Sequence, residues 1–457
     1  MTPDASDFWF LPLGGTGEIG MNLNLYGHDG RWLMVDCGVT FEQNTDVDGD
    51  EITAGRAHIQ MADPQFIVDR RDKLDGLIIT HAHEDHIGAV PYLWSKFRCP
   101  IYTTAFTAEI LRRKLVEANL QDKVPVTIVD VNQHINIGVF GVDWLALTHS
   151  IPEPHALLIS TPVGKVFHTA DWKLDSNPVL GQAYQQQDYQ ALAKQGVDAM
   201  VCDSTNANVA GWSGSEASLY KGLKQHIENA KGRVVVTCFG SNIARLHTIA
   251  KIAEETQRHL GLLGRSLVNN MSAAKAVGVW PTVETFVEPS HLGYLPAHTV
   301  LLVATGSQGE PRTALNRLST NSFRDMQLEP GDTVIFSSKM IPGNEIAIES
   351  MIERLKAMKV DVITADESVL PIHASGHPAQ EELKAMYDWV KPDCAIPVHG
   401  EIQHLTANAK IARSVGVPEQ LLGKNGDLFF IAPVKGIRRS AVKTGRLGIK
   451  DKKLIKL

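Results

Sequence analysis

The chain has 457 residues, of which 44% are hydrophobic and 21% are charged. This is an ordinary globular composition for a chain long enough to form two or three domains. No apolar run approaches the roughly 18 residues of a membrane span, and the acidic N-terminus lacks a signal-peptide pattern, so we expect no membrane partner. The five cysteines are scattered and never spaced as C-x-x-C. That pattern excludes a zinc ribbon and favours a reducing, cytoplasmic location.

The charge is unevenly distributed along the chain. The formal net charge of −7 does not by itself indicate nucleic-acid binding. Residues 435–457 differ, because they contain nine Lys or Arg and a single acid, Asp451. This basic tail can hold phosphates or can be a solvated end, and composition leaves both interpretations open.

Short apolar runs that end at polar residues predict buried strands in the first part of the chain. They lie at residues 32–36, 76–80 and 144–148. Helical patterns occupy residues 107–118 and 216–230. Strands and helices mixed in this way predict a layered α/β architecture.

Between residues 213 and 359 the pattern changes to regular alternation of strands and helices. Strands are predicted at residues 232–237, 299–304 and 332–336, each followed by a loop rich in Gly, Ser or Asn. A parallel-sheet domain presents ligand loops in this way. The earlier pattern then returns, which predicts one domain inserted into another. The three parts that we expect are residues 1–208, 209–360 and 361–457.

The strongest chemical signal is His81-Ala82-His83-Glu84-Asp85-His86, directly after the strand that ends at Thr80. Imidazole nitrogens and carboxylate oxygens are ligands for divalent metals. In a loop that leaves a strand, residues i and i+2 point the same way. His81 and His83 can therefore bind one ion, while Asp85 and His86 turn towards a second. A polar surface loop is the alternative, and four ligand-type residues in six make it the weaker one.

Three further candidate ligands, His149, Asp171 and His399, each follow another predicted strand. A lone histidine after a strand is usually a structural residue. Beside the H-x-H-x-D-H loop, however, these three residues favour a centre for two metals.

These motifs resemble those of the metallo-β-lactamase-fold hydrolases, a class that includes lactamases, thioesterases, lactonases and nucleases. Further segments are similar to ribonuclease J, a family of β-CASP nucleases, and the resemblance runs from about residue 8 to residue 427. One departure is Ala170, because the family usually has glycine at this position, directly before the aspartate that corresponds to Asp171. The segments that carry the resemblance are residues 13–20, 203–207, 305–311, 341–345, 375–377 and 397–401.

The resemblance implies a metallo-β-lactamase αββα sandwich with an inserted β-CASP parallel-sheet domain. It also implies a ribonuclease, 5′-to-3′ exonucleolytic, endonucleolytic or both, in the processing and decay of RNA, including ribosomal RNA. Two divalent ions are implied, zinc in preference to manganese, as is a homodimer or homotetramer. Chains of this family normally continue into a C-terminal domain, which we expect to be missing here.

The resemblance also implies roles for individual residues. Asp203 and His377 match a pair beside the scissile phosphate, and Asp85 counts as both ligand and catalytic residue. Asp36 matches a residue that braces the metal loop, although an Asx turn explains it equally well. The implied ligands are His81, His83 and His149 for one metal, Asp85, His86 and His399 for the other, and Asp171 for both.

Since an imidazole held by Asp203 favours its protonated form near neutral pH, His377 is the candidate general acid. A loop-capping role is the alternative for His377. Residues that end or follow strands are candidates for holding RNA, although ordinary turn chemistry also explains them. The candidate RNA contacts are Ser375, Gly376 and His373 near the acid, and Ser241, Arg265 and Ser307 in the inserted domain.

Two rival functions remain open. A small-molecule hydrolase would use the same metals on an ester or a lactam, but the inserted domain and the Asp203–His377 pair count against it. A catalytically silent RNA-binding scaffold would lack metal ligands, whereas all seven are present here.

Overall fold

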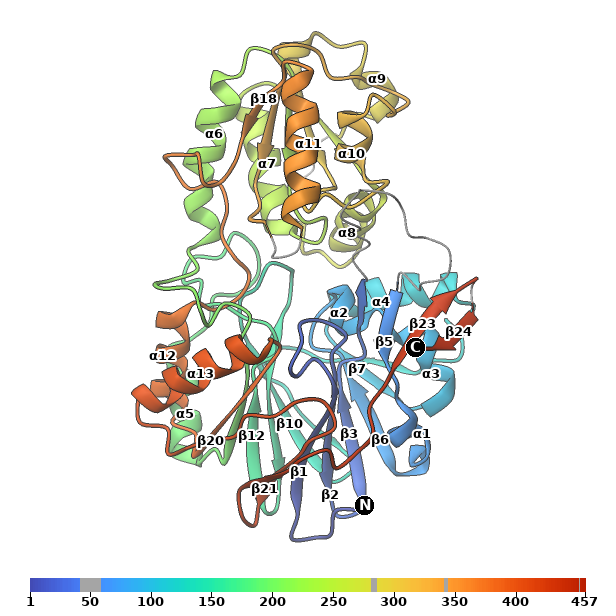
Figure 1. The fold of residues 1–457 in the computed structure, drawn as a ribbon, viewed down its shortest axis with the longest axis vertical. Helices are drawn as coiled ribbons and strands as arrows, with labels where there is room; N and C mark the ends of the chain where they lie inside the picture. The colour runs from blue at the N-terminus through green and yellow to red at the C-terminus, as the bar shows by residue number, and fades with distance from the viewer. Residues whose placement is uncertain (42–58, 281–285, 341–343, 452) are drawn as a thin grey trace.

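A computed structural model describes residues 1–41, 59–280, 286–340, 344–451 and 453–457. Residues 341–343 of the 341–345 motif therefore lie outside the described residues. Two packed sheets form one part of the molecule, and the inserted domain lies above them in Figure 1. Within the described residues, no helix combines the length and the apolar character that a membrane crossing requires.

The first sheet of the sandwich has eight strands in the order β22-β21-β1-β2-β3-β6-β7-β8. Helices α1 (Gln65–Val68), α3 (Val90–Phe97) and α4 (Ala105–Glu117) contribute apolar side chains to the core on its outer face. Its strands are β1 (Phe8–Gly14), β2 (Leu23–His28), β3 (Arg31–Val35), β6 (Leu74–Ile78), β7 (Ile101–Thr103), β8 (Val126–Ile128), β21 (Leu428–Ala432) and β22 (Gly436–Arg438).

The second sheet has seven strands in the order β20-β19-β13-β12-β11-β10-β9. Helices α5 (Gln186–Gln195), α12 (Gln380–Val390) and α13 (Ile402–Ser414) cover its outer face. The inner faces of both sheets share one apolar core, so the layers run helix, sheet, sheet, helix. Its strands are β9 (His134–Ile137), β10 (Phe140–Ala146), β11 (His155–Thr161), β12 (Gly164–His168), β13 (Ala199–Asp203), β19 (Cys394–Val398) and β20 (Glu419–Gln420).

The inserted domain is built on a five-stranded sheet in the order β15-β16-β14-β17-β18, and every pair in it is parallel. Its three central strands, β16, β14 and β17, are fully buried runs such as Val-Leu-Leu-Val-Ala, as a sheet covered on both faces requires. Its elements are β14 (Val234–Thr237), β15 (His259–Leu263), β16 (Val300–Ala304), β17 (Thr333–Phe336), β18 (Asp361–Ile363), α6 (Leu219–Asn229), α7 (Ile243–Glu255), α8 (Arg265–Ala276), α9 (Pro289–Leu292), α10 (Ala314–Ser319) and α11 (Glu345–Ala357).

The basic tail is not a free end within the described residues. Strand β22 extends the eight-stranded sheet. An antiparallel sheet has the order β24 (Lys453–Lys456), β23 (Arg446–Lys450), β5 (Ile59–Ala62) and β4 (Val39–Phe41), so β23 joins the tail to β5. Arg446 forms an ion pair with Glu18. These basic residues therefore lie on strands that pack against the sandwich.

Short 3-10 turns complete the elements, at Arg71–Lys73, Glu216–Ser218 and Ala297–Thr299. The one-turn helix α2 (Glu84–Ile87) belongs to the functional site, because it carries two of the candidate metal ligands. The predicted α/β sandwich with an inserted parallel-sheet domain is confirmed.

Candidate metal centre and active site

The candidate ligands gather at one edge of the sandwich because of how its strands run. Strands β12, β13 and β19 are parallel neighbours, and β10 runs in the same direction, so their carboxyl ends meet. Asp203 ends β13, and His149, Asp171 and His399 follow β10, β12 and β19. His81 follows β6 of the other sheet and completes the cluster from across the sandwich.

The first group of donor atoms comes from His81, His83, His149 and Asp171. His83 Nδ1 lies 3.1 Å from His81 Nε2 and 3.0 Å from His149 Nε2. Asp171 Oδ2 lies 3.9 Å from His81 Nε2 and 3.8 Å from His149 Nε2. Three imidazole nitrogens and one carboxylate oxygen that converge in this way fit a divalent cation.

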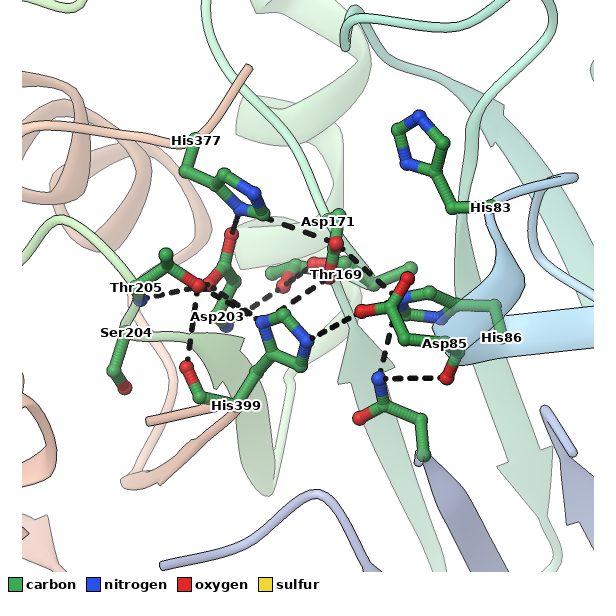
Figure 2. Close-up of polar contacts among 12 residues, drawn as sticks. His83, Asp85, His86, Thr169, Asp171, Asp203, Ser204, Thr205, His377 and His399 are labelled. Atoms are coloured by element: carbon green, nitrogen blue, oxygen red, sulfur yellow. Dashed lines mark hydrogen bonds and ion pairs between the residues drawn. The ribbon is translucent and has the colours of Figure 1, made fainter. Parts of the chain in front are cut away.

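The second group consists of Asp85, His86, Asp171 and His399. Asp171 Oδ2 lies 3.2 Å from His86 Nε2, and Asp171 Oδ1 lies 3.6 Å from His399 Nδ1. Asp85 Oδ2 contacts His399 Nε2 at 3.1 Å. Figure 2 shows the Asp171 carboxylate between His377 and His86. Asp171 thus belongs to both groups, which is the arrangement that two adjacent cations require.

The protonation of the first group suits metal binding. Burial is the main cause that lowers the pKa of His83 to about 4, and it holds the pKa values of His81 and His149 well below the usual value. At neutral pH these rings are therefore uncharged and keep a lone pair for a cation.

The carboxylates of the centre stay charged although they are buried. Burial on its own would raise the pKa of Asp171, but His399 and His86 hold it well below its usual value. Burial opposes ionisation of Asp85 too, and His86 and His399 outweigh it, so the pKa of Asp85 is also lowered. The pair brings the negative charge that divalent cations neutralise.

Asp36 braces the metal loop from behind. Its Oδ2 lies 2.7 Å from His86 Nδ1, and its Oδ1 accepts a hydrogen bond of 2.8 Å from Thr80 N. A carboxylate on the outer nitrogen of a metal-binding histidine fixes the ring and its tautomer. The structure therefore favours the bracing role of Asp36 over a simple Asx turn.

The Asp203–His377 pair forms, with Asp171 and His399, a third group of converging donor atoms. His377 Nδ1 lies 2.8 Å from Asp203 Oδ2 and 3.9 Å from Asp171 Oδ2. Burial lowers the pKa of His377, but the Asp203 carboxylate outweighs this effect and raises it above the usual value. His377 is thus an imidazole that favours its protonated form within the site.

Within the loop that carries His377, the neighbouring residues fix its shape. Ser375 Oγ accepts hydrogen bonds from Asn206 Nδ2 at 2.7 Å and from His377 N at 3.2 Å. The Gly376 carbonyl contacts His149 Nδ1. A Cβ at Gly376 would lie 2.8 Å from His149 Cε1, so only glycine allows this close approach.

The other candidate RNA contacts occupy different environments. Ser241 Oγ lies 3.0 Å from His83 Nε2, whereas His373 Nδ1 contacts the Ser337 carbonyl at 3.2 Å. Arg265 is exposed at the first position of α8, and Ser307 is buried at 2% exposure. RNA binding by these residues remains a prediction.

Some site residues escaped the sequence reasoning. Thr205 Oγ1 donates to Asp203 Oδ1 at 2.7 Å and contacts His399 Nδ1 at 2.8 Å. Asn22 Nδ2 donates to the Asp85 carbonyl at 3.1 Å. The signal for Thr205 was its place in the 203–207 segment, two residues after Asp203. Ala170, just before Asp171, has a φ of 51° in the left-handed region, where an L-residue costs about 1 kcal/mol and glycine is favoured.

An αββα sandwich whose strand ends hold two His and Asp donor groups defines a metal-dependent hydrolase of the metallo-β-lactamase fold. Three family models match the chain in order. They are described as Metallo-beta-lactamase superfamily over residues 20–188, Ribonuclease J, beta-CASP domain over residues 231–355, and Zn-dependent metallo-hydrolase RNA specificity domain over residues 367–418.

Comparisons over most of the chain agree. Ribonuclease J of Sinorhizobium meliloti is 42% identical over 429 residues, which cover 93% of this chain and 74% of that protein. Ribonuclease J of Mycolicibacterium smegmatis is 38% identical over 441 residues, covering 95% and 76% of the two chains. The chain belongs to the ribonuclease J family, and it is accordingly a hydrolase of the ribonuclease class that uses divalent metal.

A solved structure shares the fold alone. It is a protein of unknown function from Enterococcus faecalis, with a TM-score of 0.62 and 15% identity over 93% of this chain and all of that one.

Proposed function

We propose that this enzyme hydrolyses RNA phosphodiester bonds with two divalent ions, zinc in preference to manganese. His81, His83 and His149 hold one ion, Asp85, His86 and His399 hold the other, and Asp171 contacts both. The observation that carries the proposal is the membership of Asp171 in both donor groups, beside the Asp203–His377 pair. When bound, two such ions would lower the pKa of a water molecule and neutralise charge on a phosphate oxygen.

His377 supplies the proton that the leaving oxygen needs. Its Nδ1 is held by Asp203 at 2.8 Å, so Nε2 is the atom that donates. The Asp203 carboxylate stabilises the imidazolium before transfer and keeps the ring oriented. Thr205 in turn holds Asp203 through the hydrogen bonds to its Oδ1.

Asp85 serves both as a ligand and as the carboxylate that takes a proton from the attacking water. Its side chain is 30% exposed, whereas those of Asp171 and Asp203 are 3% and 0% exposed. Asp85 is therefore the most accessible carboxylate of the three to an incoming solvent molecule.

The RNA strand would lie between the sandwich and the inserted domain. Ser375, Gly376 and His373 would meet it near the acid. Arg265 would meet a phosphate at the start of α8, where backbone N–H groups and an exposed guanidinium both favour an anion. Ser241 and Ser307 complete the proposed set of RNA contacts. The enzyme would cleave RNA at 5′ ends, within the strand, or both.

The organisation of the molecule is also part of the proposal. Residues 209–360 form the inserted unit between the two parts of the sandwich, 1–208 and 361–457. Family membership supports a homodimer or homotetramer, and sedimentation would distinguish either from a monomer of 50.1 kDa.

Five free, buried thiols support a reducing compartment such as the cytoplasm.

The test uses RNA with a 5′-monophosphate and the same RNA with a 5′-triphosphate, each with and without a metal chelator. We expect cleavage that the chelator abolishes. Mononucleotides from the monophosphate RNA alone would indicate the exonuclease, and internal fragments from both would indicate the endonuclease. Intact RNA after incubation with metal-loaded protein that hydrolyses an ester or a lactam would refute the proposal.

A further inference from the structure

The junction between β14 and α7 of the inserted domain touches the metal centre. Residues 238–242 connect the two elements, and Asn242 caps α7 by accepting a hydrogen bond of 2.9 Å from Arg245 N. Next to this cap, Ser241 Oγ lies 3.0 Å from His83 Nε2. The contact joins two residues that are 158 positions apart.

The tautomer of His83 gives this contact its direction. His83 Nδ1 is the atom that converges with His81 and His149, so it is the nitrogen that faces a cation. A neutral imidazole that offers Nδ1 carries its hydrogen on Nε2. His83 therefore donates from Nε2 to Ser241 Oγ, and this outer hydrogen bond orients the ligand ring.

Ser241 differs in origin from the other outer partners of the ligand histidines. Among the described residues, the ring nitrogens of those histidines contact residues of the sandwich or of the loops that carry the ligands. The inserted domain thus supports one metal ligand directly. These other contacts are His81 with Thr80, His86 with Asp36, His149 with Gly376 and His399 with Thr205.

Arg245, in the first turn of α7, contacts the segment that leads to His377. It is 1% exposed and pairs with the Glu216 carboxylate. Its Nη1 donates to the Ser337 carbonyl at 2.7 Å, and its Nη2 donates to the Ala374 carbonyl at 3.5 Å. Ser337 Oγ in turn donates to the Ile372 carbonyl at 2.6 Å. This network holds the segment immediately before Ser375-Gly376-His377.

We propose that residues 241–245, which form the start of α7 and the residues just before it, are a positioning element for both halves of the active site. Ser241 orients the ligand His83, and Arg245 fixes the segment that leads to His377. The inference rests on the proposed function, which makes His83 a metal ligand through Nδ1. Ser241, one of the candidate RNA contacts, would therefore act through the ligand His83 and not by contacting RNA.

The first test is metal affinity, measured by competition of the purified full chain with a chromogenic zinc chelator. Ser241→Ala removes the acceptor, and we expect the affinity for one of the two zinc ions to fall about 10- to 100-fold. Ser241→Thr keeps a hydroxyl and should restore most of that affinity. Ser350→Ala makes the same change at an exposed position on α11 of the same domain and should match the wild type.

The second test separates the acid side from the metal side. Ser337→Ala and Arg245→Lys each loosen the support of the 372–374 segment. We expect kcat to fall by about 10-fold to 10²-fold, because the acid would be misplaced. KM and the affinity for zinc should stay unchanged. Thermal unfolding of the same samples identifies any variant that is not folded, in which case the other variant decides.

The outcomes distinguish the inference from the function on which it rests. A wild type that binds fewer than two zinc ions overturns the proposed function itself. A wild type with two ions and a Ser241→Ala variant of equal affinity overturns the role of Ser241 alone. Unchanged kcat in folded Ser337→Ala or Arg245→Lys overturns the role of Arg245.

Discussion

Histidines only a few ångströms apart at this site have opposite pKa shifts. Burial lowers the pKa of His83 to about 4, and the carboxylates of Asp85 and Asp171, which act in the opposite direction, do not outweigh it. His86 and His399 are more deeply buried than His83, yet facing carboxylates raise their pKa values well above the usual one. Neighbours rather than depth therefore decide which rings are neutral and which are charged.

His155 allows a test of this reasoning outside the metal centre. Burial lowers its pKa to about 4, against an ordinary value of 6.5. The unfolded chain therefore binds the proton more tightly than the folded one. The contribution to stability is complete above pH 6.5 and is lost as the pH falls from 6.5 towards 4. The loss amounts to about 3 kcal/mol.

Urea unfolding at pH 7 and pH 4, with a chelator present throughout, measures this contribution. His155→Gln cannot titrate, so the variant should lose about 3 kcal/mol less between the two pH values than the wild type does. Equal losses in both proteins would show that His155 is not a buried neutral ring.

At the residue scale, the proposed metal ligands could be chosen from the sequence, whereas the residues that support them could not. His81, His83, Asp85 and His86 share one short motif, and the remaining ligands follow strands that hydrophobic patterns reveal. The contact between Ser241 and His83, by contrast, depends on how an inserted domain docks. No local pattern in the sequence encodes that distance.

At the element scale, the loop after β3 lies close to helix α2, which carries the candidate ligands Asp85 and His86. This close approach depends on Gly38. A Cβ there would lie 1.7 Å from the Asp85 carbonyl oxygen and 2.6 Å from His86 N, both backbone atoms of the metal loop. Gly38→Ala should therefore displace α2, cost about 1–3 kcal/mol or more of stability, and reduce zinc binding.

Thermal unfolding and zinc titration check this prediction. Gly436→Ala is the matched control, because the nearest atom to its new Cβ is Phe430 Cδ2 at 3.9 Å. Should Gly38→Ala bind zinc and unfold like Gly436→Ala, the steric account of the metal loop would be wrong.

Hydrophobic patterns predicted many of the elements well. The runs at 232–237, 299–304 and 332–336 correspond to β14, β16 and β17, and the helical pattern at 107–118 corresponds to α4. The basic tail was harder, because β23 and β24 are short runs with charged residues at both ends, and they are placed by pairing of β24 with β23 and of β23 with β5. Short strands of this kind carry a weak local signal.

At the scale of the whole molecule, one chain crosses between two packed units and brings the site together from both. The sandwich supplies the donor groups through its strand ends, while the inserted domain supplies Ser241 and Arg245. The change in sequence pattern indicated the insertion, because parallel strands buried on both faces differ from those of a mixed sandwich. The docking of the two units depends on contacts between residues far apart in the chain.

The most direct test of the whole account is RNA cleavage by wild type and His377→Ala, with metal content determined on the same samples. If His377 protonates the leaving oxygen, its loss should slow cleavage by about 10²–10⁴. Asp203→Asn should be milder, since it weakens the imidazolium without deleting it. Both metals should remain, because none of the seven ligands is changed. Full activity in His377→Ala would contradict the acid role, and loss of activity together with one metal would make His377 a ligand instead.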